Sequence, residues 1–367
     1  MPSLRAGVER LPPYAGGRPI EEVAREVGLD PRSVVKLASN ESPLPPFPEV
    51  VDAIVAHAGS LNRYPDNGWN DVARAVGEWL EVDEKNLMFA GGSSELLRVF
   101  ALALGGIGTS AVYGWPSFII YRLASVLAGS ETVEVPLTAD HRLEPYALVN
   151  AIRGDTKILY VCNPNNPTGT YISSEQVKEL IDAVPESVLV VVDEAYFDYV
   201  TAADYASAIP EALARPNVVV TRTFSKVFGL AALRVGYAIG QAETLIELRR
   251  AQAPFTVGTL GMIAATEAVR HTSRIRERVQ ANKSERERLS DELTRRQIEY
   301  VPSQTNFLYM RPSPAAGMEE ALLRRGVIVR AFDEGWLRVT IGNPEENDRF
   351  LTELDGIRKD QRLKTKD

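Results

Sequence analysis

Short runs of apolar residues between positions 87 and 239 constrain the fold of this 367-residue chain more than any other feature. Several runs, such as residues 188–192 and 218–220, contain consecutive valines and leucines rather than alternating apolar and polar residues. Continuous runs are typical of strands that are buried on both faces of a parallel sheet. Stretches with helical spacing separate them, so we predict an α/β fold with a mostly parallel sheet flanked by helices. The expected strands cover residues 87–90, 111–113, 132–135, 157–161, 188–192, 218–220 and 237–239.

The chain is expected to contain an N-terminal arm and two domains. The arm, residues 1–30, begins with a Pro- and Gly-rich stretch that is typical of a segment wrapping other structure. The large domain, residues 31–245, should start with helices at 49–58 and 70–80, and Asn70 is the expected N-cap of the second helix. Residues 246–367 should form a small α+β domain, because charged helical stretches are followed there by further apolar runs. These runs are residues 306–310, 327–329 and 336–341.

Composition favours small-molecule chemistry over binding to nucleic acid or membrane. The formal net charge is −8 at pH 7, which repels polyanions. The first 17 residues contain no apolar signal segment, and no run of about 18 apolar residues occurs, so we expect a cytoplasmic protein. With one cysteine, Cys162, and three histidines, we expect no metal site. Basic residues between 274 and 288 are interleaved with acidic ones, which indicates a solvated helix.

Residues 106–111 match the loose pattern G-x-G-x-x-A of dinucleotide-binding loops. Such a loop must follow a strand and open a helix. Here the pattern closes a helical stretch at 96–104 and precedes an expected strand, so we interpret it as a helix-ending turn.

Polar residues follow the strand that is expected at 218–220, at the edge of the sheet where ligands of α/β proteins usually bind. Thr223, Ser225 and Lys226 come first, and Arg234 lies eight positions after the lysine. Hydroxyl groups, one lysine and an arginine in this arrangement suit a phosphate-bearing aldehyde cofactor. The alternative is that Lys226 is an ordinary solvated surface charge.

Three other expected strands also end in polar residues. Asp193 follows residues 188–192 and could either cap a turn or hold a proton on a pyridine nitrogen. Asn166 lies in the turn 163–169, where an amide can bind a phenolate oxygen without carrying charge. Residues 91–95 open a helix, so their N–H groups and hydroxyls form a candidate anion site, although glycine-rich helix starts are common.

In this order, the polar positions resemble the signature of pyridoxal-phosphate enzymes with the aspartate-aminotransferase fold, class I and II. The positions are Gly92, Ser93, Asn166, Asp193, Tyr196, Lys226 and Arg234. Within that group, the chain is most similar to the histidinol-phosphate and aromatic amino-acid aminotransferase branch. The matching segments are residues 37–41, 63–66, 163–169, 193–196, 223–237 and 337–340. The resemblance implies a large domain with a mostly parallel sheet, a small α+β domain and pyridoxal 5'-phosphate as the cofactor.

The resemblance also implies roles for individual residues in cofactor binding. Lys226 would form a Schiff base with the cofactor and, once displaced, move a proton between the substrate Cα and the cofactor. Asp193 would pair with the pyridine nitrogen, Asn166 and Tyr196 would bind the phenolic oxygen, and Phe118 would stack on the ring. Tyr64 would reach across a dimer interface to the phosphate of the partner. The implied phosphate site comprises Gly92, Ser93, Ser94, Thr223, Ser225 and Arg234.

For the substrate, the resemblance implies that Arg338 clamps the α-carboxylate, although an arginine on a strand can also be a surface residue. Arg330 would hold a polar or anionic side chain, and Tyr14 and Asn40 lie at substrate positions of the family. A set of aromatic residues would favour a planar substrate side chain, but each could instead belong to the core. The set is Tyr14, Trp115, Phe118, Phe332 and Trp336.

The implied activity is that of a homodimeric aminotransferase of amino-acid biosynthesis. It would transfer an amino group from an aromatic amino acid or histidinol phosphate to a 2-oxo acid such as 2-oxoglutarate. Residues 90–95 lack the asparagine and aspartate that are typical of the histidinol-phosphate enzymes, and residues 113–118, 253–257 and 344–348 look more like the aromatic enzymes.

Two other interpretations have to be weighed. The same signature is shared by enzymes of specialised biosynthesis that decarboxylate, oxidise or eliminate from an amino acid. A regulator that uses this fold as a sensor would carry a DNA-binding module before it, and the motif at 37–41 comes too early to leave room for one.

Overall fold

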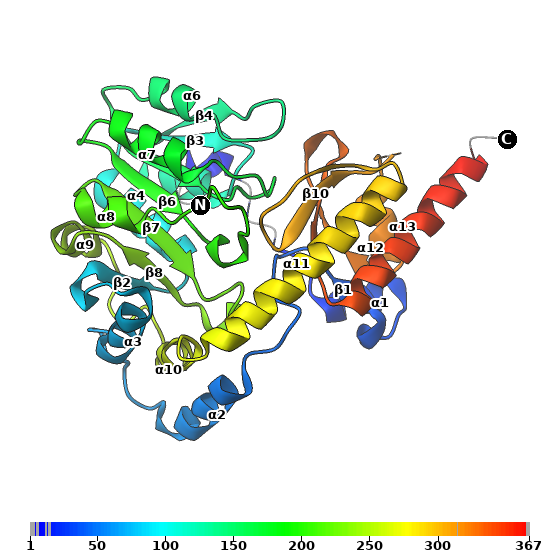
Figure 1. Ribbon diagram of the computed structural model, residues 1–367, viewed down its shortest axis with the longest axis horizontal. Helices are drawn as coiled ribbons and strands as arrows, with labels where there is room; N and C mark the ends of the chain where they lie inside the picture. Colours follow the sequence, from blue (N-terminus) through cyan, green and yellow to red (C-terminus); the bar gives the residue numbers. More distant parts are fainter. Residues whose placement is uncertain (1–3, 5–6, 12, 14–15, 314, 365–367) are drawn as a thin grey trace.

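The computed structural model describes residue 4, residues 7–11, residue 13, residues 16–313 and residues 315–364. The larger of its two domains is built on a seven-stranded sheet with the order β2-β8-β7-β6-β5-β3-β4 (Figure 1). Strand β8 is antiparallel to both neighbours, and the remaining pairs are parallel. The prediction of a mostly parallel sheet is therefore confirmed. The strands are β2 Leu87–Ala90, β3 Ser110–Trp115, β4 Glu131–Pro136, β5 Thr156–Cys162, β6 Leu189–Asp193, β7 Val218–Thr223 and β8 Gly236–Ile239.

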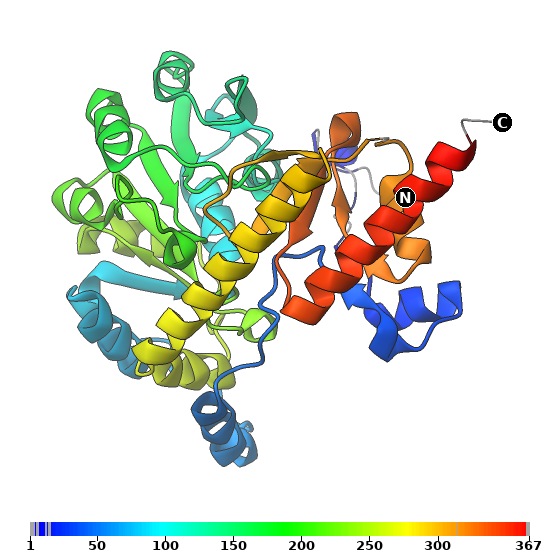
Figure 2. The same ribbon diagram turned by 45° about the vertical axis from the view of Figure 1, so that its right-hand side comes forward.

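Helices pack around this sheet and bury its central strands on both faces (Figure 2). All residues of β6 and β7 are buried, which explains why their sequences are continuous apolar runs. The turn at 105–108 ends α4 and precedes β3, so the helix-ending interpretation of this glycine pattern is confirmed. The helices are α2 Pro48–His57, α3 Asn70–Leu80, α4 Ser93–Leu104, α5 Ile120–Ala128, α6 Pro145–Asn150, α7 Ser174–Ala183, α8 Ile209–Ala214, α9 Ala242–Arg249 and α10 Thr259–Ala268.

The expected N-cap of α3 is wrong. Asn70 is the first residue of the helix, and Trp69 precedes it in a left-handed conformation with φ 59°. The side chain of Asp66 takes the capping role, because its Oδ2 accepts a hydrogen bond from the backbone N–H of Asn70 at 2.9 Å.

The small domain contains a four-stranded antiparallel sheet with the order β12-β13-β10-β9. The 24-residue helix α11 runs along both domains (Figure 2). Its buried Arg286 donates hydrogen bonds to the carbonyls of Tyr199, in the large domain, and Thr305, in the small domain. Among the described residues, no helix is long and apolar enough to cross a membrane. The elements are β9 Glu299–Val301, β10 Phe307–Arg311, β11 Val327–Ile328, β12 Arg330–Ala331, β13 Leu337–Thr340, α11 Thr272–Arg295, α12 Met318–Arg324 and α13 Pro344–Lys364.

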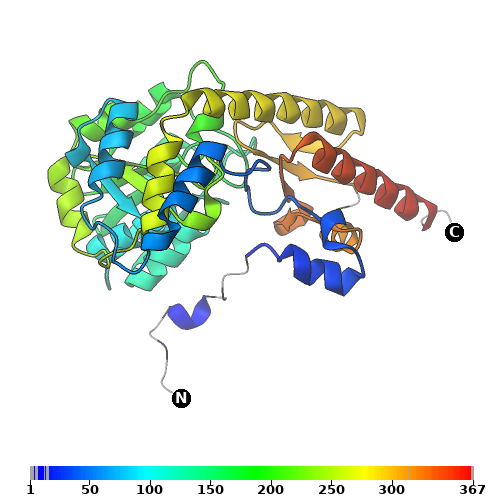
Figure 3. The ribbon, with the colours of Figure 1, turned by 90° about the horizontal axis from the view of Figure 1, so that it is seen from below.

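Segments that are distant in sequence contribute to each domain. Helix α1, Ile20–Val27, and strand β1, Val35–Lys36, lie against the small domain, where β1 pairs with β11 (Figure 3). Helix α10 packs instead on α2 and α3 of the large domain. The domain boundaries at residues 30 and 245 stay a prediction. The contacts show that α1 and β1 pack on the small domain and that α10 packs on the large domain.

Candidate active site

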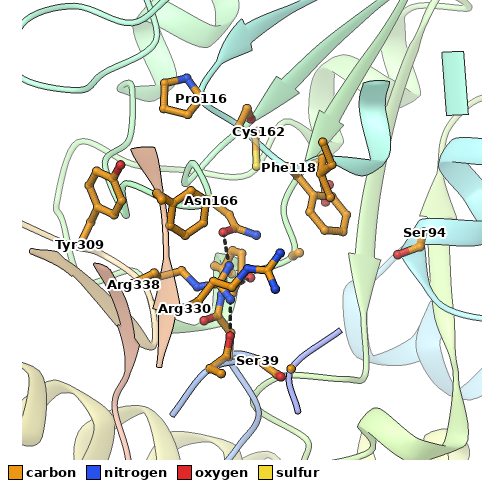
Figure 4. A pocket seen from close by; sticks show the side chains of 18 of the residues that line it. Ser39, Ser94, Pro116, Phe118, Cys162, Asn166, Tyr309, Arg330 and Arg338 are labelled. Atoms are coloured by element: carbon orange, nitrogen blue, oxygen red, sulfur yellow. Dashed lines mark hydrogen bonds between the residues drawn. The ribbon is translucent and has the colours of Figure 1, made fainter. Parts of the chain in front are cut away.

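A cavity of about 990 Å³ lies between the two domains, at the carboxyl ends of β5, β6 and β7. Because these strands are parallel neighbours, their following residues meet at one edge of the sheet. Asn166, Asp193 and Lys226 consequently line the same cavity. Arg330 and Arg338 of the small domain line it too, and Figure 4 shows them beside Asn166.

The start of α4 forms a candidate anion site in the cavity wall. Gly92 precedes the helix with φ 90°, and an added Cβ there would lie 2.4 Å from Nη2 of Arg234. The absence of a side chain therefore lets the guanidinium lie over the helix N-terminus. Arg234 also donates to Oγ of Ser225 at 3.3 Å, and Ser225 Oγ accepts from Thr223 at 3.0 Å. A helix N-terminus, hydroxyl groups and a guanidinium together suit a phosphate, and Ser93 and Ser94 complete the lining here.

Asp193 is a buried carboxyl group with a raised proton affinity. Its pKa is raised to about 6, mainly by burial and to a smaller extent by the charge of Glu194, whereas hydrogen bonds to its oxygens act in the opposite direction. Tyr121 donates to Oδ2 at 2.9 Å, and Thr221 donates to Oδ1 at 3.1 Å. The sequence interpretation missed Tyr121, although it lies one helical turn after Phe118 and its ring contacts that of Phe118 at 5.8 Å.

Lys226 is not a solvated surface charge, so that alternative is wrong. Its Nζ donates hydrogen bonds to the backbone carbonyls of Asn40 at 3.1 Å and Ser39 at 3.4 Å. Its pKa is lowered to about 7, mainly by burial and also by the charges of Arg338 and Arg234, while Glu41 and Asp193 act in the opposite direction. Near neutral pH the lysine therefore exchanges between ammonium and free amine.

Arg338 lies in the cavity rather than on the surface. Its guanidinium donates to Oδ1 of Asn166 at 2.7 Å and to the carbonyl of Ala38 at 2.6 Å. Asn40, in a left-handed conformation with φ 54°, donates from Nδ2 to the hydroxyl of Tyr196 at 2.8 Å. These contacts tie the small-domain strand β13 to the residues around Lys226.

Aromatic side chains form part of the cavity wall. The predicted lining residues Trp115, Phe118, Phe332 and Trp336 all belong to it. Two further residues, Tyr309 and His141, were not predicted. Tyr309 stacks on Trp336 with centroids 4.5 Å apart and planes at 7°, and His141 packs edge-on against Trp336 at 4.7 Å. The wall offers a flat apolar surface that suits a planar side chain.

Tyr64 is not among the residues that line this cavity. Tyr64 is 83% exposed and stacks on Phe255, with ring centroids 4.8 Å apart. Its role toward a partner subunit stays a prediction. Tyr14 lies outside the described residues. Within the described part of the chain, no group of three or more His, Cys, Asp or Glu residues could hold a metal ion.

Comparison with known proteins gives full-length matches. The family model for aminotransferase class I and II matches residues 32–354. The histidinol-phosphate aminotransferase of Halalkalibacterium halodurans is 39% identical over 350 residues, which cover 94% of each chain. The histidinol-phosphate aminotransferase of Bacillus velezensis is 39% identical over 356 residues, covering 96% of this chain and 98% of the relative.

Solved structures of aminotransferases also match the fold of this chain. Histidinol-phosphate aminotransferase from Sinorhizobium meliloti, in complex with pyridoxal-5'-phosphate, matches with a TM-score of 0.90 and 25% identity over 98% of both chains. Aspartate aminotransferase from Thermus thermophilus with maleate matches with a TM-score of 0.82 over 96% of this chain and 99% of that chain. Its identity of 23% shows the fold alone. The matches confirm the resemblance that the sequence motifs indicated.

Proposed function

Because this chain belongs to the class I and II aminotransferase family and is a pyridoxal-phosphate-dependent transaminase, we propose that its amino donor is histidinol phosphate or an aromatic amino acid. The proposed acceptor is a 2-oxo acid such as 2-oxoglutarate. The observation that carries the proposal is the stacked aromatic pair formed by Tyr309 and Trp336, which lines the same cavity as Lys226. The names of the 39% identical relatives support histidinol phosphate as a candidate.

The cavity fits the cofactor, because an anion site, a buried carboxyl group and a lysine of lowered pKa line the same space. Bound pyridoxal phosphate supplies an aldehyde that takes up the amino group and a ring that withdraws electrons from the reacting carbon. In this proposal the phosphate is held by Ser93, Ser94, Thr223, Ser225 and Arg234. Gly92 leaves room for the guanidinium of Arg234.

The remaining residues orient the ring and the substrate. Asp193 would hold a proton on the ring nitrogen, Asn166 and Tyr196 would bind the phenolic oxygen, and Phe118 would stack on the ring. Arg338 would bind the carboxylate of an amino acid, or the phosphate of histidinol phosphate, in bidentate fashion, and its contacts with Asn166 and Ala38 orient the guanidinium. Arg330 and Asn40 contact the rest of the substrate.

Lys226 is the proposed acid and base. Its pKa of about 7 would allow the free amine to take the proton from the substrate Cα and to deliver it to the former aldehyde carbon of the cofactor. The cavity is shaped by residues of both domains, so that solvent is displaced from Lys226 when the substrate fills it.

We also propose that the enzyme is a homodimer with shared active sites. The exposed apolar residues Val51, Val55, Leu61 and Tyr64 lie on or near α2, together with Phe255. A second copy covering them would bury this surface and bring Tyr64 to the phosphate of the partner.

A donor screen tests the proposed activity. The protein is loaded with pyridoxal phosphate, and the visible absorbance of the bound cofactor is recorded after addition of phenylalanine, tyrosine, tryptophan or histidinol phosphate. We expect the band to disappear with at least one donor and to return when 2-oxoglutarate is added. If all four leave the band unchanged, the proposed donor class is wrong. Release of carbon dioxide, ammonia or peroxide without glutamate would contradict transamination of that donor.

A further inference from the structure

Both oxygens of the Asp193 carboxyl group accept hydrogen bonds from fully buried hydroxyl groups. Tyr121 donates to Oδ2 from the first turn of α5, and Thr221 donates to Oδ1 from the neighbouring strand β7. Tyr121 and Asp193 are 72 positions apart in the sequence. The carboxyl group is therefore held from two sides by elements that do not belong to its own strand.

Aromatic packing fixes the ring of Tyr121. It stacks on Tyr160 with centroids 4.7 Å apart and planes at 12°, and it meets Phe118 edge-on at 5.8 Å and 90°. Tyr113 contacts the same ring at 5.9 Å. A ring that is packed on several sides cannot swing away, so its hydroxyl remains directed at Asp193.

We propose that Tyr121 is a positioning residue that acts through Asp193, orienting its carboxylate and keeping it anionic so that the proton resides on the cofactor ring nitrogen. The inference rests on the proposed placement of that nitrogen at Asp193. Burial favours the neutral acid, and a hydroxyl donor favours the carboxylate. When a proton is shared between two groups, it resides on the more basic one. Loss of the Tyr121 hydroxyl makes Asp193 more basic and draws the proton away from the ring, which weakens the ring as an electron acceptor.

The test measures where this proton resides rather than activity alone. Wild-type and Tyr121→Phe proteins are loaded with pyridoxal phosphate carrying 15N in the ring, and the ring 15N chemical shift is recorded. We expect a protonated ring nitrogen in the wild type and a shift toward the unprotonated value in the variant, with a fall of about tenfold in kcat. An unchanged 15N shift in Tyr121→Phe would overturn the inference.

Tyr160→Phe is the matched control, because it removes a hydroxyl from the neighbouring stacked ring, which makes no hydrogen bond to Asp193 among the described residues. We expect its 15N shift to equal that of the wild type. An equal change in both tyrosine variants would show a packing effect and would also overturn the inference. Thr221→Val, which removes the second donor, gives an independent variant should Tyr121→Phe not fold. Its 15N shift should move in the same direction as that of Tyr121→Phe. An unchanged shift would contradict the proposed effect of the hydroxyl donors on Asp193.

Asp193→Asn separates this inference from the proposal on which it rests. If Asp193→Asn alters the ring 15N shift and Tyr121→Phe does not, the placement of the cofactor stands and the role of Tyr121 is wrong. If Asp193→Asn also leaves the shift unchanged, the ring nitrogen is not at Asp193, and the proposed cofactor placement fails.

Discussion

At the scale of single residues, burial sets the chemistry of the active site. It raises the pKa of Asp193 to about 6 and lowers that of Lys226 to about 7. Both shifts disfavour the charged form, as expected for groups removed from water. The hydrogen bonds from Tyr121 and Thr221 lower the pKa of Asp193 and so offset part of the effect of burial. Lys226 can therefore exchange a proton near neutral pH, and the Asp193 carboxyl group can still be ionised there.

We predict a pH dependence for the reactivity of Lys226 in the cofactor-free protein. Only the free amine is acylated, and a lowered pKa makes this form available at lower pH than the ordinary lysine pKa of about 10.4. The acylation rate should rise with pH with a midpoint of about 7. Quantitative peptide mass spectrometry measures this rate, with the exposed Lys178 as an internal reference. A midpoint above about pH 9 would contradict the predicted burial effect.

The sequence predicts site residues where one strand and its following turn carry the signal. Asp193 and Lys226 could be recognised because each follows a buried run. Tyr121 could not, because its significance lies in a contact between α5 and the end of β6. Tyr309 and His141 were missed for the same reason, since they join Trp336 from separate segments.

At the scale of secondary-structure elements, close approach between β8 and the start of α4 builds the anion site. Gly236 lies in β8, and an added Cβ there would lie 2.3 Å from the backbone nitrogen of Ser93. To relieve this clash, either β8 or the start of α4 would have to shift, and the helix N-terminus would then move relative to Arg234. The missing side chain is thus a condition for the geometry of the phosphate site.

Gly236→Ala should therefore weaken both stability and cofactor binding. Overpacking of this kind costs about 1–3 kcal/mol in the free energy of unfolding. Thermal unfolding of the cofactor-free protein measures the first effect, and equilibrium titration with pyridoxal phosphate measures the second. Gly106→Ala is the control, since an added Cβ there meets nothing within 4 Å. Equal behaviour of the two variants would refute the role assigned to Gly236.

All seven strands of the large sheet could be predicted. Strands buried on both faces, such as β6 and β7, leave a continuous apolar run, whereas the edge strand β4 is buried only at Val135 and carries alternating valines. The short strands β9 and β12 could not, since residues such as Glu299 and Arg330 carry no apolar pattern and pair only through their neighbours. The error at Asn70 has a similar cause, because the side chain that caps α3 comes from Asp66, outside the helix.

At the scale of the whole molecule, the proposed dimer makes two chains share each active site. Lys226 lines the cavity of its own chain, whereas Tyr64 is exposed and stacked on Phe255. If Tyr64 serves the partner, variants that damage different sites should complement each other.

We expect Lys226→Ala to be inactive and Tyr64→Ala to be about tenfold less active, because it loses a phosphate contact. Subunit exchange between the two variants should then raise the activity, since a mixed dimer contains one site with both residues intact. The assay compares the exchanged mixture with the two variants measured separately. Activity no higher than their average would argue against sharing of Tyr64.

The most direct test of the central claim follows the amino nitrogen itself. The loaded enzyme is incubated with histidinol phosphate or phenylalanine that carries 15N in the amino group, together with unlabelled 2-oxoglutarate, and the products are examined by NMR. We expect 15N in glutamate and the carbonyl compound of the donor in equal amount. Label in ammonium, or label retained in a decarboxylated amine, would contradict it.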